Sequence, residues 1–235
     1  MKKLIGGSII AIAAVMGLHN SAQAADIITK AKEEVVLEKP VSPWQIRVRA
    51  LGVIPRNSGS VNQVKGSDLD FSKTVTPELD ITYYFTKNIA AELVLGTTYS
   101  NVNAKGTIKD LGKIGKTWLL PPTLTLQYHF TNFGAFKPYV GAGVNYTIFY
   151  NQKDYGDIHD LKIKNRAGGA VQVGFDYMIN EHWGFNFDVK KLFLRPNFRA
   201  TLYGTDDNGF LTKTKLTGKA KLDPWLIGAG ITYRF

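Results

Sequence analysis

The side chains with the greatest chemical potential are charged, and they recur at alternate positions of otherwise apolar segments. Two carboxyl groups held close together can act as general acid and base. A carboxylate beside a guanidinium or ammonium group forms an ion pair instead. Because both signs of charge occur together, ion pairing is the better explanation. The charged set consists of Arg47, Arg49, Glu78, Asp80, Glu92, Asp176, Asp188, Lys190 and Arg234.

Other groups that could support catalysis are scarce. The chain has no cysteine, and of its four histidines only His129 lies inside a regularly alternating segment. The pattern places no serine beside His129, so a Ser/His/acid arrangement is not indicated. No spacing of histidine and acidic residues resembles a metal site. We therefore expect no catalytic residues, metal or cofactor, and an enzyme acting on envelope lipids is a hypothesis that rests on His129 alone.

Strict alternation of apolar and polar residues is typical of β-strands with one apolar face. In the last segment, Trp225 to Phe235, one face is apolar with aromatic residues at both ends. Ten steps of about 3.3 Å at a tilt of roughly 40° span about 25 Å, the height of the apolar band on a membrane β-barrel. Eight such segments occur, at 44–51, 78–85, 89–96, 123–130, 139–148, 171–179, 183–190 and 225–235.

The connections between these segments alternate in length. Residues 86–88, 131–137 and 180–182 are short links, whereas 56–75, 99–121, 151–166 and 203–219 are long and polar. Bacterial outer-membrane barrels have short periplasmic turns and long extracellular loops. A soluble eight-stranded barrel buries its apolar face inwards and shows no such alternation. The sequence thus predicts an all-β fold, an eight-stranded antiparallel transmembrane β-barrel located in the bacterial outer membrane.

The N-terminal residues have the features of a secretory signal peptide. Two lysines precede a short apolar run, and Ala22-Gln23-Ala24 forms a cleavage site. The apolar run is too short to span a bilayer. The expected organisation is a signal peptide at 1–24, a polar periplasmic lead-in at 25–43 and the barrel at 44–235.

The formal net charge is +10, and Lys2 and Lys3 contribute two of these charges, so the exported chain keeps +8. A basic balance suggests an anionic neighbour, either lipopolysaccharide phosphates or nucleic acid. Export argues against nucleic acid. Outer-membrane lipids and lipopolysaccharide are the expected neighbours, although most loop lysines are explained equally well as solvated charge. The candidate lysines are Lys105, Lys109, Lys113, Lys116, Lys213 and Lys215.

With the apolar faces turned to lipid, the inward residues define the function. The charged set should plug the lower and middle lumen, because unpaired buried charges are costly. Above the charged set, apolar residues point into the lumen or lie in the long segment 99–121. This favours a small hydrophobic ligand. Because the charged set blocks the way straight through, such a ligand would have to leave sideways through the wall. Packing of loops onto the barrel rim explains these residues equally well. The candidate substrate path is Leu51, Val53, Val94, Phe149, Trp118, Leu119 and Leu120.

Several strings resemble the OmpW/AlkL family of outer-membrane proteins. They are Leu111-Gly-Lys-Ile-Gly115, Leu120-Pro-Pro-Thr-Leu-Thr-Leu-Gln-Tyr-His-Phe130, Lys137-Pro-Tyr-Val-Gly-Ala-Gly-Val-Asn-Tyr-Thr147, and Leu222-Asp-Pro-Trp225 leading to Tyr233-Arg-Phe235. The resemblance implies an eight-stranded barrel with a narrow hydrophobic lumen. It also implies passive uptake of small hydrophobic compounds with lateral release into the membrane.

The leading hypothesis is a monomeric outer-membrane channel for small hydrophobic molecules. The alternative is a structural or adhesive barrel that binds partners through its long loops and their lysines. The terminal Phe235, preceded by alternating aromatic residues, resembles the signal read by the barrel-assembly machinery during insertion.

Overall fold

The computed structural model describes residues 42–235 of the 235-residue chain. The expected signal peptide and residues 25–41 of the expected lead-in lie outside this range. The described residues are almost entirely β-strand, with a single 3₁₀ turn, η1 (Lys109–Leu111). Within this range no helix is long and apolar enough to cross a membrane.

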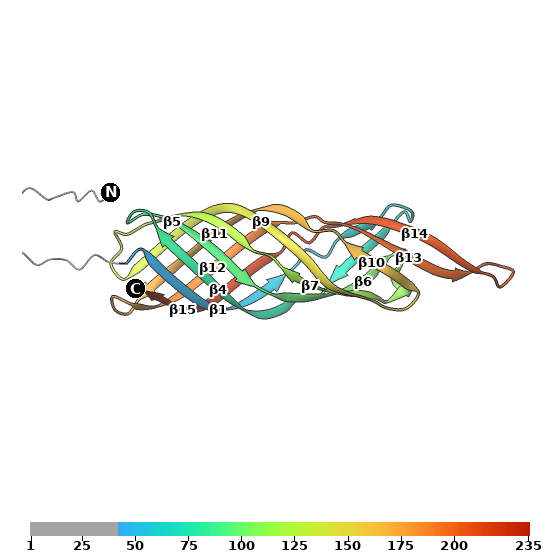
Figure 1. The fold of residues 1–235 in the computed structure, drawn as a ribbon, viewed down its shortest axis with the longest axis horizontal. Coiled ribbons are helices and arrows are strands. Elements are labelled where there is room, and N and C mark those ends of the chain that lie inside the picture. The colour runs from blue at the N-terminus through green and yellow to red at the C-terminus, as the bar shows by residue number, and fades with distance from the viewer. Residues whose placement is uncertain (1–41) are drawn as a thin grey trace, which may run out of the picture. The chain divides into compact units, whose positions relative to one another are not determined.

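Eight long strands close into an antiparallel barrel, which confirms the predicted fold (Figure 1). The order around the ring is β11-β12-β15-β1-β4-β5-β8-β9, and β9 pairs with β11 to close it. The eight strands are β1 (Trp44–Ile54), β4 (Thr74–Tyr84), β5 (Ile89–Gly96), β8 (Thr123–His129), β9 (Phe136–Asp154), β11 (Arg166–Met178), β12 (Trp183–Phe193) and β15 (Trp225–Arg234).

The apolar face of each strand points out of the barrel. Val48, Leu126 and Phe185 are each more than half exposed, as lipid-facing residues must be when the lipid is not counted. Aromatic rings pack against one another near the short turns, for example Trp183 against Tyr233 at 4.7 Å between ring centroids. Because side chains alternate along a strand, the polar residues between these positions are turned into the lumen.

The four long segments were expected to be polar loops, and this expectation was wrong. Most of their residues extend the barrel wall as further strands (Figure 1). One group joins the edge of β9, and the other forms a separate four-stranded sheet in the order β10-β13-β14-β2. The first group is β7 (Lys113–Leu120), β6 (Thr98–Gly106) and β3 (Ser67–Phe71). The second is β10 (Ile158–Ile163), β13 (Asn197–Thr205), β14 (Leu211–Ala220) and β2 (Gly59–Val61).

These extensions enclose an apolar core of their own, which includes Leu69, Val102, Ile114, Phe149 and Leu216. Beyond the aromatic residues nearest the membrane, their outward positions face water rather than lipid, and most of them are polar, as Lys213, Lys215 and Thr217 of β14 show. Because these outward positions are polar, the segments read as loops in the sequence. Their inward positions nevertheless stay apolar outside the membrane. The same physical rule thus builds both parts of the barrel.

Candidate functional site

Arg47 of β1 lies at the centre of an ion-paired lower lumen. Its guanidinium donates two parallel hydrogen bonds to Asp176, with Nε–Oδ1 at 3.0 Å and Nη2–Oδ2 at 2.7 Å. It also pairs with Glu92 and donates to the hydroxyl of Thr82. All four side chains are buried. Such bidentate, charge-assisted contacts fix the planar guanidinium firmly across the lumen.

Arg49, the next inward residue of β1, forms a second ion-paired centre. Its Nη2 lies 2.6 Å from Glu78 Oε1 and 2.7 Å from Asp80 Oδ2. Glu78 stands directly opposite Arg49 in the β1–β4 ladder, so strand register alone brings these charges together. Arg49 also donates to Asn186 at 2.8 Å. The result is a second layer of paired charge above the first.

Lys190 and Asp188 complete this arrangement from β12. The Lys190 ammonium lies 3.6 Å from Asp188 and 3.7 Å from Glu92. Arg234, the remaining member of the charged set, stacks over the Tyr84 ring at 4.2 Å and is less deeply buried. The structure therefore brings the predicted charged residues together inside one lumen. We call them the lumen plug.

His129 is part of the packing below the plug. Its ring lies between those of Tyr84 and Tyr139, and its Nε2 lies 2.9 Å from Gln127 Oε1. The structure puts no serine hydroxyl within hydrogen-bond distance of it among residues 42–235. In the same range no group of three or more histidine or acidic side chains is arranged to hold a metal ion. This geometry is that of a satisfied structural histidine.

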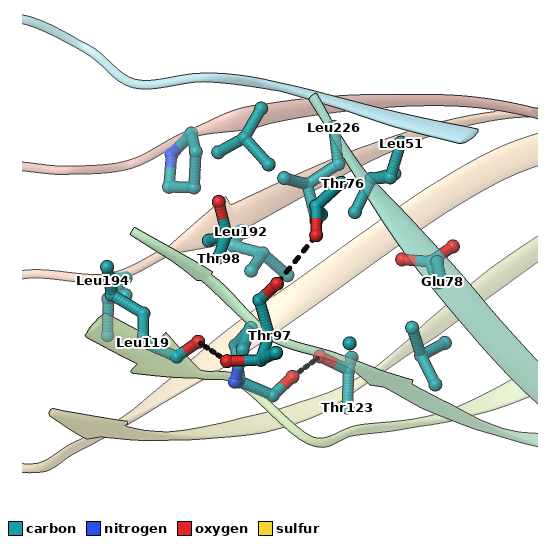
Figure 2. A pocket seen from close by; sticks show the side chains of 15 residues that line it. Leu51, Thr76, Glu78, Thr97, Thr98, Leu119, Thr123, Leu192, Leu194 and Leu226 are labelled. Carbon is teal, nitrogen blue, oxygen red and sulfur yellow. Dashed lines mark hydrogen bonds between the residues drawn. The ribbon is translucent and has the colours of Figure 1, made fainter. Parts of the chain in front are cut away.

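An apolar pocket lies directly above the plug (Figure 2). It is a small cavity of about 50 Å³, enough for a few water molecules, so a larger guest must widen it. Leucine side chains from β1, β7, β12 and β15 project toward its centre, and Glu78, at the right of Figure 2, belongs both to the pocket lining and to the plug. Its apolar lining residues are Leu51, Val53, Val94, Leu119, Pro121, Leu192, Leu194, Pro224 and Leu226.

Four of the seven candidate path residues line this pocket, namely Leu51, Val53, Val94 and Leu119. Phe149 is buried higher up, in the core of the extracellular strands. Trp118 lies between Tyr99 and Tyr150 on the outer face of the wall. Leu120 is two residues further along β7 and shares that outer face.

The pocket lining includes four residues that were not predicted from the sequence: Leu192, Leu194, Pro224 and Leu226. Leu192 and Leu194 continue the inward alternation that begins with Asp188 and Lys190 on β12. Extending that alternation by two positions would have found them. Pro224 is placed by the preceding residue, Asp223, which has a positive φ of 27°. A single turn of this kind leaves no periodic signal in the sequence.

Beside the pocket, the barrel wall lacks a continuous backbone ladder. The β4–β5 ladder ends at Glu78 and Gly96, and the β5–β8 ladder ends at Val94 and Thr123. The β8 side continues into Pro121-Pro122, which have no N–H to donate.

Threonine side chains join the strands above this point. Thr76 Oγ1 donates to the Thr97 carbonyl at 2.6 Å, as Figure 2 shows. The hydroxyls of Thr74 and Thr98 lie 2.7 Å apart. Thr76, Thr97 and Thr98 also line the pocket, so the pocket adjoins a stretch of the wall where the backbone ladder is interrupted and side-chain hydrogen bonds join the strands.

A closed eight-stranded barrel with an apolar outer face and a polar lumen defines an integral outer-membrane β-barrel protein. Within that class the chain belongs to the OmpW family, whose family model matches residues 43–235. It is 61% identical to the outer-membrane protein y4mB of Sinorhizobium fredii over 83% of this chain and 81% of that protein.

Two further relatives agree with this assignment. The chain is 32% identical to outer membrane protein W of Escherichia coli over 80% of this chain and 87% of that protein. The crystal structure of the outer membrane protein OprG from Pseudomonas aeruginosa superimposes with a TM-score of 0.72 at 27% identity. That match covers 83% of this chain and 97% of OprG. The protein is therefore located in the outer membrane, surrounded by lipid.

Proposed function

We propose that this protein is an outer-membrane channel for the passive uptake of small hydrophobic molecules. The observation that carries the proposal is the apolar pocket, which lies above the plug and beside the stretch of wall where the backbone ladder is interrupted. Apolar surfaces with few polar groups bind hydrophobic ligands. A molecule in this pocket meets paired charges below and threonine contacts at the side. The threonine contacts at the side are easier to separate than the buried ion pairs below, so the molecule leaves the pocket sideways into the membrane.

The closed ring within one chain supports a channel that works as a monomer, since β9 and β11 complete the wall without a partner. The family assignment is in keeping with the proposal. No step requires an energy source, because a hydrophobic molecule moves from water to lipid down its own free-energy gradient.

Leu51→Asp is expected to slow uptake of N-phenyl-1-naphthylamine, a hydrophobic fluorescent probe, by roughly tenfold or more. An unpaired carboxylate in an apolar wall costs well over 1.4 kcal/mol, the equivalent of a factor of ten. Fluorescence of whole cells expressing each variant measures the rate. Val94→Thr is the companion variant, because it keeps the side-chain shape and should slow uptake with less risk to folding.

Leu211→Asp is the matched control, because it makes the same chemical change at an exposed position of β14 that does not line the pocket. It should leave uptake unchanged. Wild-type uptake in folded Leu51→Asp and Val94→Thr barrels would contradict the channel proposal. That result would favour a structural or adhesive barrel acting through its extracellular strands.

The lateral exit is tested by a disulfide across the wall, in the double variant Thr74→Cys/Thr98→Cys. The hydroxyls of these residues lie 2.7 Å apart, which puts their β-carbons near the separation that a disulfide needs. The chain has no other cysteine. Oxidation should stop release of the fluorescent probe into the membrane, and a reducing agent should restore it. Equal release rates in the oxidised and reduced forms would refute a lateral exit at this place.

A further inference from the structure

Three aromatic rings form a ladder on the outer face of the wall, one from each of three adjacent strands. Tyr99 of β6, Trp118 of β7 and Tyr150 of β9 have ring centroids 5.5 Å and 6.3 Å apart. Trp118 is ten residues from Tyr128, a ring near the short turns, which corresponds to about 25 Å along the membrane normal. The ladder thus lies where the hydrocarbon meets the outer headgroups, the position of aromatic girdles in such barrels.

Two lysines lie just beyond this ladder, directly opposite each other in the β7–β9 pairing. Lys116 is the cross-strand partner of Lys153. The Lys116 ammonium lies 4.3 Å from the centre of the Tyr99 ring and 5.7 Å from that of Trp118. Lys116 is two residues beyond Trp118, and two residues along a tilted strand add roughly 5 Å of height, which places both lysines in the headgroup layer.

The pair of lysines has no acidic partner in the part of the chain that the structure describes. The ion pairs found among residues 42–235 involve other basic residues, such as Lys105 with Asp70 and Arg195 with Asp223. The adjacent Asp154 instead accepts a hydrogen bond from the Leu161 N–H at 3.1 Å. Like charges directly opposite each other destabilise a sheet unless an anion lies between them. The two opposed lysines therefore call for an anionic ligand from outside the described chain.

We propose that Lys116 and Lys153 form a binding site for a phosphate group of lipid A, the phosphorylated membrane anchor of lipopolysaccharide. The two ammonium groups neutralise the phosphate, and the aromatic ladder below packs against the first carbons of the acyl chains. Two properties of the site favour a membrane lipid as the ligand. The lysines match an anionic phosphate, and the aromatic ladder lies at the membrane boundary, where it can contact an apolar tail attached to that phosphate. This site is independent of the proposed transport function.

The test is binding of lipid A to the full-length protein in detergent, measured by native mass spectrometry. Lys116→Gln/Lys153→Gln should weaken binding of bisphosphorylated lipid A by roughly 25-fold, at about fivefold for each lysine near a lipid phosphate. Lys116→Arg/Lys153→Arg should bind like the wild type. Dephosphorylated lipid A should bind the wild type as weakly as bisphosphorylated lipid A binds the glutamine variant.

Lys213→Gln/Lys215→Gln is the matched control. Both lysines lie on β14, and Lys213 also lies over an aromatic ring, that of Tyr203 at 4.8 Å. The control removes the same charge from an extracellular strand without the ladder, and it should bind lipid A like the wild type. Heat-dependent gel migration shows that each variant is folded. The proposal is overturned if the glutamine variant at 116 and 153 binds like the wild type, if the control loses as much, or if dephosphorylated lipid A binds equally well.

Discussion

Replacement of Arg47 by methionine is expected to lower the free energy of unfolding by about 3–5 kcal/mol, the typical cost of removing one partner from a buried ion pair. The variant leaves Glu92 and Asp176 without their shared guanidinium, and both carboxylates are almost fully buried. Arginine and methionine have similar side-chain volumes, so the loss of unfolding free energy measures the effect of the missing charge rather than of altered packing. Urea unfolding of the barrel in lipid vesicles, followed by tryptophan fluorescence, measures the effect.

Two further variants isolate the cause. Lys105→Met breaks the ion pair with Asp70 outside the membrane, where the lysine side chain is 51% exposed, and should cost less than about 1 kcal/mol. Arg47→Met/Glu92→Gln/Asp176→Asn removes the charges together and should recover most of the lost stability. A triple variant as unstable as Arg47→Met alone would show that the guanidinium acts through shape rather than charge.

Gly230→Ala, in the last barrel strand β15, is expected to lower the free energy of unfolding by a similar amount. A β-carbon at this position would lie 2.0 Å from the Val48 carbonyl oxygen and 2.6 Å from the Arg49 α-carbon. Both atoms belong to the backbone of β1, so no side chain can rotate away. Overpacking typically costs 1–3 kcal/mol, and a clash with fixed backbone should cost about 3 kcal/mol or more. The same urea titration measures the loss.

Gly228→Ala is the matched control, because Gly228 faces the lumen two residues away on the same strand. A β-carbon there would come no closer than 3.3 Å, and its nearest neighbours are side-chain atoms of Arg49 rather than backbone atoms. The expected loss is about 1 kcal/mol or less. If the two alanine variants were equally stable, close approach of β15 to β1 would not be the reason for glycine at 230.

The alternation of residue types predicted the transmembrane part of the fold well because the two faces of each strand lie in different environments. Lipid requires an apolar residue at every outward position, and the narrow lumen collects the charges between them. Arg49 and Glu78 could therefore be assigned to the same lumen from their strand positions. Their direct pairing depends on the exact register, and the alternation alone excludes only shifts by an odd number of residues, because a shift by two keeps every side chain on its face.

The extracellular strands were missed because water replaces lipid on their outer face. In β14, for example, Lys213 and Lys215 lie where apolar residues would stand within the membrane, so the segment appears to be a polar loop. Trp118 was placed in the substrate path because apolar character alone does not reveal which face a residue occupies. Only the pairing of β7 with β6 and β9 turns its ring outward.

The lumen plug also has an electrical consequence. A hydrated ion entering from either end would have to separate guanidinium and carboxylate groups that are almost wholly buried, and would lose its water without gaining equivalent ligands. The barrel should therefore behave as an insulator toward salt although it spans the membrane. A cell could carry many copies of this protein without altering the ionic conductance of its outer membrane.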